Sequence, residues 1–438
     1  MLSILNKVSM CAGRLGNMFS CRHLTKFFGL GTLIPLAMWA ANGVAADIKF
    51  SGVLDVRAHV VSSDANNASY LKGDFGRFRF DDGLGFSLGQ LGLKSQLSFD
   101  NNWSATIVAN VFSEEGDLAV GFTEAFAKYK GLPNANGWRW GAKVGLFYPE
   151  ISLEHIATAW SNPYTLTSST LNNWVGEEFR SLGGSLSIEK LGKFKRSDHD
   201  FSFSFSAFQN NDPAGAMLAW HGWTIGSRQT LTQERLVIPY FPALSADLSF
   251  QARHSDPFLE LDDRWGIHLH GNWRYKKGAK LTAGFYDNHA REGIVKQGHY
   301  TWTTKFSHFG GKYKVSKNIE LIGQYMGGNT YMTSPTGVNV VNNDFSTGYL
   351  LLRYLIGNSQ IAARAELFDV DDKDSLPGDN NNENGKALTL SYRHQLSRQS
   401  FVFTEYNWVS SNRPARVYAW QPESLIERQY QLGYRFYF

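Results

Sequence analysis

The chain contains two cysteines, Cys11 and Cys21, and both lie within its first 46 residues. The rest of the chain therefore cannot form a disulfide or a cysteine metal site. The twelve histidines show none of the spacings that characterise zinc-binding motifs. We therefore expect neither a metal ion nor another cofactor.

Residues 47–438 also lack an excess of charge of either sign. The sequence has 43 basic and 39 acidic residues, and four of the basic ones precede residue 47, where there is no acid: Lys7, Arg14, Arg22 and Lys26. The remainder is therefore formally neutral. A nucleic-acid-binding surface needs a basic excess on one face, so we expect no nucleic-acid partner.

Long apolar runs are missing as well, because a membrane-spanning helix needs roughly 20 apolar residues and no stretch reaches that length. The longest run, Phe27–Ala41, follows the four basic residues and precedes Val44-Ala45-Ala46. This order is typical of a secretory signal peptide, so residues 1–46 are predicted to be cleaved, leaving 47–438 as the mature domain. A membrane anchor is the alternative, and Met18 is a second candidate for the start.

Alternation of apolar and polar residues is the main pattern in the mature chain. In the stretch 48–60 apolar or small residues occupy every second position, and similar stretches are 201–208, 265–275 and 386–394. A period of two predicts strands with one apolar and one polar face. A soluble sandwich would alternate too, but apolar faces that end in Trp or Tyr and connections that alternate in length are typical of a transmembrane β-barrel. Without a spanning helix, a membrane protein must close into such a barrel.

We expect an all-β fold, a closed antiparallel barrel of about sixteen strands. The expected strands are 48–60, 86–99, 103–113, 120–130, 138–147, 181–190, 201–209, 264–276, 279–287, 300–316, 319–329, 346–357, 360–369, 386–395, 400–410 and 428–438. The stretch 210–263 includes Ser245–Arg253, which would give eighteen strands if it formed part of a further hairpin. The last strand should pair with 48–60 so that the barrel has no open edge.

The segment Phe147–Arg180, between the fifth and sixth expected strands, loses the alternation. Pro149 and Pro163 interrupt strand structure, and the apolar and aromatic content is too high for a disordered loop. Connections of this length are usually functional. We therefore expect this segment to pack against the barrel and to contribute to function.

These features together resemble the porins of Gram-negative outer membranes. The final "QYQLGYRFYF" matches the C-terminal strand signal that the barrel-assembly machinery reads, with Tyr434, Phe436 and Phe438 as its aromatic residues, and "YPEISLEH…NNWVGEE" resembles poorly characterised porin-like proteins. The resemblance implies a multi-pass barrel in the cell outer membrane, a third outer loop folded into the lumen, contacts with lipid and lipopolysaccharide, and a homotrimer. The acidic Pro-Glu-Phe-Gly-type motif of many porins is missing from the loop.

The resemblance also implies where a pore would be narrowest. The loop acids Glu150, Glu154, Glu177 and Glu178 would face a basic wall formed by Arg57, Arg353, Arg364, Arg393 and Arg435 on the polar faces of strands. Opposed charges across a narrow aqueous gap create a transverse field that orients polar solutes. The alternative is that these arginines pair with acids of the wall, such as Glu366 and Glu405.

Three other motifs point less clearly to function. Ser87 lies in a G-x-S-x-G pattern, but between two expected strands and not at a strand-to-helix turn, so we expect no catalytic serine. His268 and His270 lie on the polar face of one expected strand, so we expect them to line the barrel wall and to face water. The acidic segment 369–385 is typical of a solvated outer loop, although it could bind Ca²⁺ or bridge lipopolysaccharide phosphates.

The sequence thus predicts a passive diffusion channel for small hydrophilic solutes and ions, and not an enzyme. A substrate-specific porin for a sugar or an anion such as phosphate is the alternative within the same class. An outer-membrane hydrolase and a structural or adhesive barrel are alternatives from other classes.

Overall fold

The computed structural model describes residues 46–438 except 66, 115, 116 and 277, so the predicted signal segment lies outside the described residues apart from Ala46. Residues 48–98 with 102–438 form one compact unit. This unit holds nearly all of the barrel. None of the described helices is long and apolar enough to cross a membrane.

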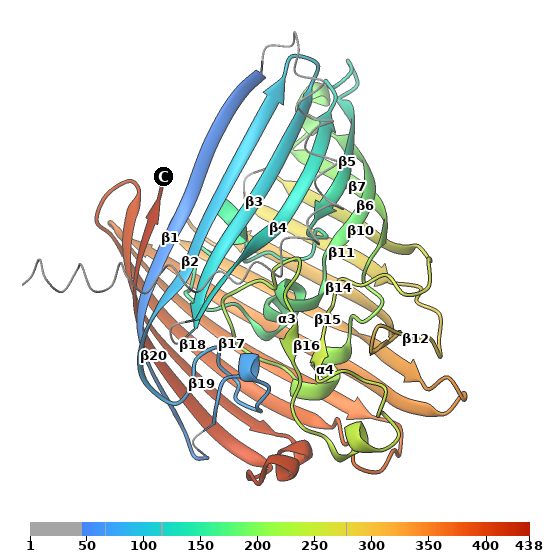
Figure 1. The fold of residues 1–438 in the computed structure, drawn as a ribbon. Coiled ribbons are helices and arrows are strands. Elements are labelled where there is room, and N and C mark those ends of the chain that lie inside the picture. Colours follow the sequence, from blue (N-terminus) through green and yellow to red (C-terminus); the bar gives the residue numbers. More distant parts are fainter. Residues whose placement is uncertain (1–45, 66, 115–116, 277) are drawn as a thin grey trace, which may run out of the picture. The chain divides into compact units, whose positions relative to one another are not determined.

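Sixteen antiparallel strands form a closed barrel in which each strand pairs with its neighbours in sequence order (Figure 1). Their bounds are β1 Ala46–Ser63, β2 Gly83–Phe99, β3 Trp103–Glu114, β4 Asp117–Lys130, β5 Trp138–Phe147, β6 Ser181–Lys190, β7 His199–Gln209, β10 Gly266–Tyr275, β11 Ala279–Asp287, β14 Thr303–Lys314, β15 Ile319–Thr333, β16 Asn339–Ile356, β17 Ser359–Asp372, β18 Glu383–Gln395, β19 Ser400–Asn412 and β20 Ser424–Tyr437. The expected sixteen-stranded barrel is confirmed.

The first and last strands close the barrel. β1 pairs with β20 in one continuous register from Val53 opposite Tyr437 to Ser63 opposite Glu427. Phe438 continues this pairing, because its backbone exchanges hydrogen bonds with Gly52 at 2.8 and 3.2 Å. The expected pairing of the chain's last strand with 48–60 is therefore confirmed, and the closed sheet has no free edge.

The eighteen-stranded alternative is wrong. Between β7 and β10 the chain forms a short helix, α4 (Ala216–His221), and a two-residue ladder between β8 (Leu236–Val237) and β9 (His254–Ser255). Within Ser245–Arg253 the chain turns on itself, since Gln251 N donates to Leu248 O at 2.9 Å. The buried Leu248 side chain joins an apolar cluster instead of a lipid-facing row.

The two faces of each strand differ in chemistry and burial. On β7 Phe203 is 50% exposed and its neighbour Ser204 is 7% exposed, and on β20 Leu432 and Gln431 are 58% and 3% exposed. Aromatic residues lie at the strand ends beside the short turns, at Trp103, Trp138, Tyr275 and Tyr313. An exposed apolar band with aromatic ends is the outer face of a membrane barrel.

The connections alternate in length around most of the barrel. Short turns such as 315–318 and 357–358 lie at one end, and longer segments such as 148–180 and 210–265 at the other. Residues 334–338 form a brief connection at the long-loop end. The segment 148–180 is therefore the third connection at that end, and we call it the third loop.

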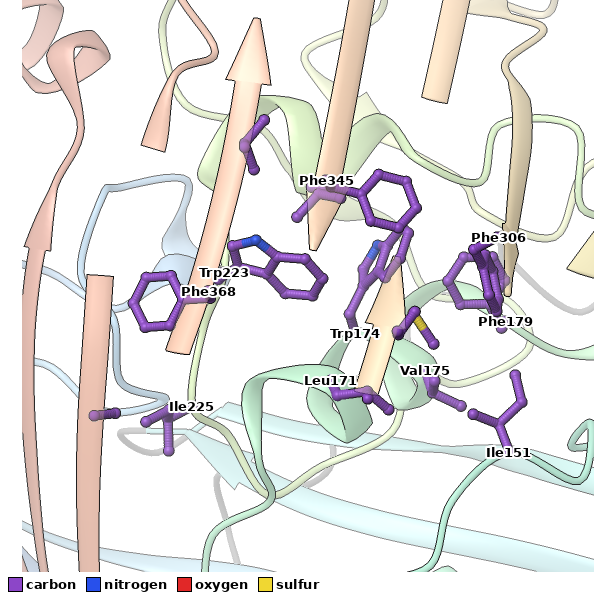
Figure 2. Close-up of a cluster of buried hydrophobic side chains, with 14 of the residues drawn as sticks. Ile151, Leu171, Trp174, Val175, Phe179, Trp223, Ile225, Phe306, Phe345 and Phe368 are labelled. Atoms are coloured by element: carbon purple, nitrogen blue, oxygen red, sulfur yellow. The ribbon is translucent and has the colours of Figure 1, made fainter. Parts of the chain in front are cut away.

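Helices of the long connections join strand side chains in two apolar clusters. In the first, Trp174 of α3 (Thr170–Glu178) contacts Phe345 of β16 at a ring distance of 4.9 Å and Trp223 at 5.4 Å (Figure 2). In the second, Trp220 of α4 contacts Trp302 edge-on at 5.2 Å. These clusters use the buried face of the strands, where the sequence pattern predicted polar side chains.

Candidate functional site

The first half of the third loop contacts strands on several sides of the barrel. Nδ1 of His270 on β10 lies 3.3 Å from a carboxylate oxygen of Glu150. The Leu153 amide donates to Oε1 of Gln324 on β15 at 2.8 Å. The Ala159 side chain packs with Val53 of β1 and Val108 of β3.

The second half contacts the strands near the end of the chain. Arg435 of β20 donates to the Asn162 carbonyl, and Gln360 of β17 donates to the Tyr164 carbonyl at 2.9 Å. The amides of Leu166 and Thr167 donate to the two carboxylate oxygens of Glu405 on β19, at 2.6 and 2.9 Å. The loop is thus bonded to buried-face side chains of β10, β15, β17, β19 and β20.

Local interactions explain the shape of the loop. Ala159 and Trp160 adopt left-handed conformations with φ of 53° and 59°, which are unusual for residues with a side chain. Stacking offsets this cost, because the Trp160 ring lies 3.6 Å from the His155 ring and 4.4 Å from the Tyr148 ring. Ser169 caps α3 by accepting from the Asn172 amide.

Glu154, one of the predicted pore acids, lies in direct contact with a predicted wall arginine. Its Oε1 is 2.8 Å from Nη1 of Arg364, and both side chains are fully buried. Burial alone would raise the pKa of Glu154, but the charge of Arg364 and hydrogen bonds from Ser169 outweigh it and lower the pKa. No aqueous gap separates this acid from the basic wall.

The other three loop acids have different partners. Half-exposed Glu150 keeps its charge, because the hydrogen bond from His270 and the nearby Lys143 outweigh desolvation and lower its pKa to about 2. Glu177 lies 3.2 Å from Nε2 of His221 in α4.

Glu178 is fully buried and accepts from Nε1 of Trp174 at 2.6 Å and from the amides of Gly215 and Met217 at 3.1 Å. These bonds tie α3 to the start of α4. Burial outweighs them and raises the pKa of Glu178 to about 7.

Most of the predicted basic wall is neutralised by neighbouring acids. Arg57 and Arg435 share Asp55 at 2.7 and 2.6 Å, Arg364 also bonds Glu366 at 2.7 Å, and Arg353 bonds Glu320 at 3.0 Å. Arg393 donates to the Pro163 carbonyl at 2.8 Å and has no ion pair among the described residues. The pairing with Glu366 is observed, whereas Glu405 binds amides of the loop.

A second set of cations lies on other strands, at positions whose side chains point to the inner face. These residues were not predicted from the sequence. Lys128 of β4 stands opposite Lys143 of β5. Arg274 of β10, Lys280 of β11 and Lys312 of β14 stand opposite one another in a row. The signal was present in the sequence, because each of these residues occupies the polar phase of an alternating strand.

The histidines at 268 and 270 are buried, so the expectation that they face water is wrong. Nε2 of His268 lies 2.9 Å from Nε2 of His308 on β14, and the three rings stack within about 6 Å of one another. Gly284 provides room for this contact, since a Cβ there would lie 2.2 Å from Nε2 of His308. The cluster packs the wall beside Glu150.

A serine–histidine pair and a cluster of three carboxylates are the remaining candidates for catalysis or metal binding among the described residues. Ser87 Oγ lies 3.3 Å from Nε2 of His59, but Nδ1 of His59 has no partner among the described residues, so this pair lacks the acid that orients a catalytic histidine. The carboxylates of Asp212, Glu260 and Asp262 lie within 4.8 Å of one another. Each of these three accepts hydrogen bonds from loop amides.

No family model matches the chain, and no curated protein matches its sequence. Solved structures do match. The outer membrane channel DcaP of Acinetobacter baumannii has a TM-score of 0.51 and 10% identity, over 90% of this chain and 98% of that chain. The anion-selective porin from Comamonas acidovorans has a TM-score of 0.49 and 12% identity, over 90% and 100% of the two chains. The likeness to the DcaP channel shows that this chain has a porin-like fold.

Proposed function

We propose that this protein is a porin of a Gram-negative outer membrane, a passive channel for small hydrophilic solutes and ions. In this proposal the third loop lies in the lumen and sets the width of the path. The observation that carries it is the ring of hydrogen bonds from the third loop to buried-face side chains of β10, β15, β17, β19 and β20. A loop bonded to strands on opposite sides of a closed barrel narrows the space between them.

The outer face of the barrel supports the membrane location. Its exposed side chains are apolar, with aromatic residues at the strand ends, so the barrel is suited to lipid and to lipopolysaccharide at its long-loop end. We propose that the terminal strand, with Tyr434, Phe436 and Phe438, is the segment that the barrel-assembly machinery recognises. A homotrimer remains part of the proposal, on the strength of the porin-like fold.

The burial pattern indicates which wall borders the path. On β15–β20 the inward side chains are buried beneath the third loop, as Gln324, Arg364 and Glu405 illustrate. On β4–β6 and β10–β11 inward residues such as Lys143, Ser187 and Lys280 are half-buried. Solutes would therefore move along the β4–β11 side of the barrel.

A closed structural barrel is the second candidate, and the two apolar clusters favour it. Trp174, Phe345, Trp220 and Trp302 fill space that is aqueous in an open channel. The hydrolase alternative has less support, because the His59–Ser87 pair lacks an orienting acid among the described residues. We therefore propose no enzymatic activity.

Liposome swelling separates the channel from the closed barrel. Liposomes containing the purified protein should swell in isotonic solutions of small sugars and not of larger oligosaccharides, with a larger size limit after deletion of Ser152–Trp174. The shift in electrophoretic mobility on heating confirms that both proteins are folded barrels. Liposomes that swell in no solute with either protein would favour the closed barrel.

A further inference from the structure

Like charges stand directly opposite one another at three places on the inner wall. The pairs are Lys128 with Lys143, Arg274 with Lys280, and Lys280 with Lys312. Opposed like charges destabilise an antiparallel strand pair by a few tenths of a kcal/mol to about 1 kcal/mol. Strand pairing therefore does not explain why cations occupy these positions. An anion in the lumen next to them would explain it.

These cations have few hydrogen-bonding or charged partners, although Nζ of Lys143 lies over the rings of Phe126 and Phe147 at 5.2 and 4.7 Å, and Nζ of Lys312 lies over the Tyr164 ring at 5.1 Å. Among the described residues, no hydrogen bond or ion pair is made by the side chains of Lys128, Lys143, Arg274 or Lys280, and Lys312 donates to the neutral hydroxyl of Tyr164 at 2.8 Å. By contrast, the arginines beneath the third loop are held by acids. Positive charge thus remains on this wall, where Lys143, Lys280 and Lys312 are half-buried and Lys128 and Arg274 are exposed.

The acids near these cations are fewer, and some are already engaged. Glu189 is paired with Arg139, and Asp200 accepts from the Gly192 amide at 2.8 Å while standing opposite Arg274. Glu124 and Glu150 lie near Lys143 and partly offset its charge. Because Glu189 is neutralised by Arg139, five cations face three remaining acids, Asp200, Glu124 and Glu150. The wall therefore carries a net positive charge.

Two strands between the cations present hydroxyl groups. Ser185 and Ser187 of β6 stand opposite Ser206 and Ser204 of β7, and their hydroxyls make no hydrogen bond to the described residues. Lys128, Lys143, Ser185, Ser187 and Ser204 line a cavity of about 70 Å³ together with Glu150. Strands lie about 4.8 Å apart, so β5 and β10 are about 14 Å apart across this floor.

We propose that this wall is an anion path, formed by Lys128, Lys143, Arg274, Lys280 and Lys312 around the serine floor, and that it makes the channel selective for small anions. The inference rests on the proposed channel function and names its solute class. Charges that line a narrow aqueous space attract counter-ions and repel ions of their own sign. The hydroxyls replace part of the hydration of an anion that passes between the two groups of cations.

The test is the reversal potential of the purified protein in a planar bilayer with a KCl gradient. We expect the wild-type protein to pass chloride in preference to potassium, and K143E/K280E to lower this permeability ratio about tenfold. K317Q, in an exposed turn between β14 and β15, is the matched control and should leave the ratio unchanged. If the charge reversal prevents insertion, the neutral variant K143Q/K280Q should lower the ratio in the same direction.

Inorganic phosphate provides a second measurement on the same bilayers. Added phosphate should reduce the chloride current through the wild-type protein and reduce it less through K143Q/K280Q. Potassium selectivity in the wild-type protein, or an unchanged ratio in the folded variants, would overturn the anion path and leave the channel intact. A bilayer that carries no current would instead refute the channel itself.

Discussion

Glu154 of the third loop and Arg364 of β17 form a buried ion pair, with Oε1 and Nη1 separated by 2.8 Å and neither side chain exposed. Arg364 also donates to Glu366, and Glu154 also accepts from the amide and hydroxyl of Ser169. Both charges are therefore fully partnered, as buried charges must be. The pair fixes the middle of the loop to the wall.

We predict that Glu154→Ala lowers the free energy of unfolding by about 3–5 kcal/mol, because it leaves Arg364 buried without its loop partner. The measurement is urea unfolding in lipid vesicles. Glu320→Ala is the matched control, since the Glu320–Arg353 pair is partly exposed and should cost about 1 kcal/mol or less. Equal losses in the two variants would contradict a special role for the buried pair.

Trp174 is expected to be the main apolar anchor of α3. Its ring contacts Trp223, Phe345 and Phe179, so Trp174→Ala should cost about 3–5 kcal/mol and loosen α3 from the wall. Amide hydrogen exchange should show faster exchange in α3 and unchanged exchange in β18–β20. Trp420→Ala, at a position 97% exposed, should change neither stability nor exchange.

The raised pKa of Glu178 predicts that the stability of the protein, through the packing of α3 against α4, depends on pH. Its pKa of about 7 lies above the ordinary value, so the folded protein binds this proton more tightly than the unfolded chain. Stability should therefore fall as the pH rises through the window from about 4.5 to 7, by up to about 3 kcal/mol for this group.

Urea unfolding at pH 5 and pH 8 measures this effect. Asp212, whose pKa burial also raises to about 7, contributes with the same sign in the wild-type protein and in Glu178→Gln. The difference between their pH slopes therefore isolates Glu178. Parallel slopes would show that Glu178 ionises as an ordinary carboxylate.

We predict that changes at the pairing of β1 with β20 impair assembly of the barrel. A Cβ at Gly52 would lie 2.3 Å from Cζ of Phe438, so Gly52→Val should displace the terminal ring. We expect this variant and deletion of Phe438 to reduce the yield of inserted barrel, with normal conductance in the molecules that insert. Gly278→Ala, where a Cβ meets no atom within 4 Å, is the control. Normal yield from both Gly52→Val and the Phe438 deletion would contradict a role for Phe438 in assembly.

The strands could be predicted from the sequence because alternation is a local signal. The predicted ranges 138–147 and 181–190 agree with β5 and β6 residue for residue. Ser245–Arg253 was wrongly considered as a further strand, because a short alternating stretch also fits a largely exposed turn in which Leu248 alone among the apolar residues packs into the loop cluster.

The site was harder to predict because its contacts depend on the register of the closed barrel. The Thr167 amide meets Glu405, which lies 238 residues away in sequence. Phe208 and Phe306 occupy the inward phase and form an apolar cluster there, so polar alternation alone did not show how the space is filled. The opposed lysines became visible only when neighbouring strands were aligned.

If the barrel conducts and the third loop limits the current, removing part of this loop must raise the unit conductance. Single-channel recording in planar bilayers, with the wild-type protein and the variant lacking Ser152–Trp174, measures this conductance. We predict discrete openings from the wild-type protein and a larger unit conductance from the variant. A closed bilayer at all voltages with both folded proteins would contradict a conducting barrel, and equal conductance from the two would contradict a constriction formed by the third loop.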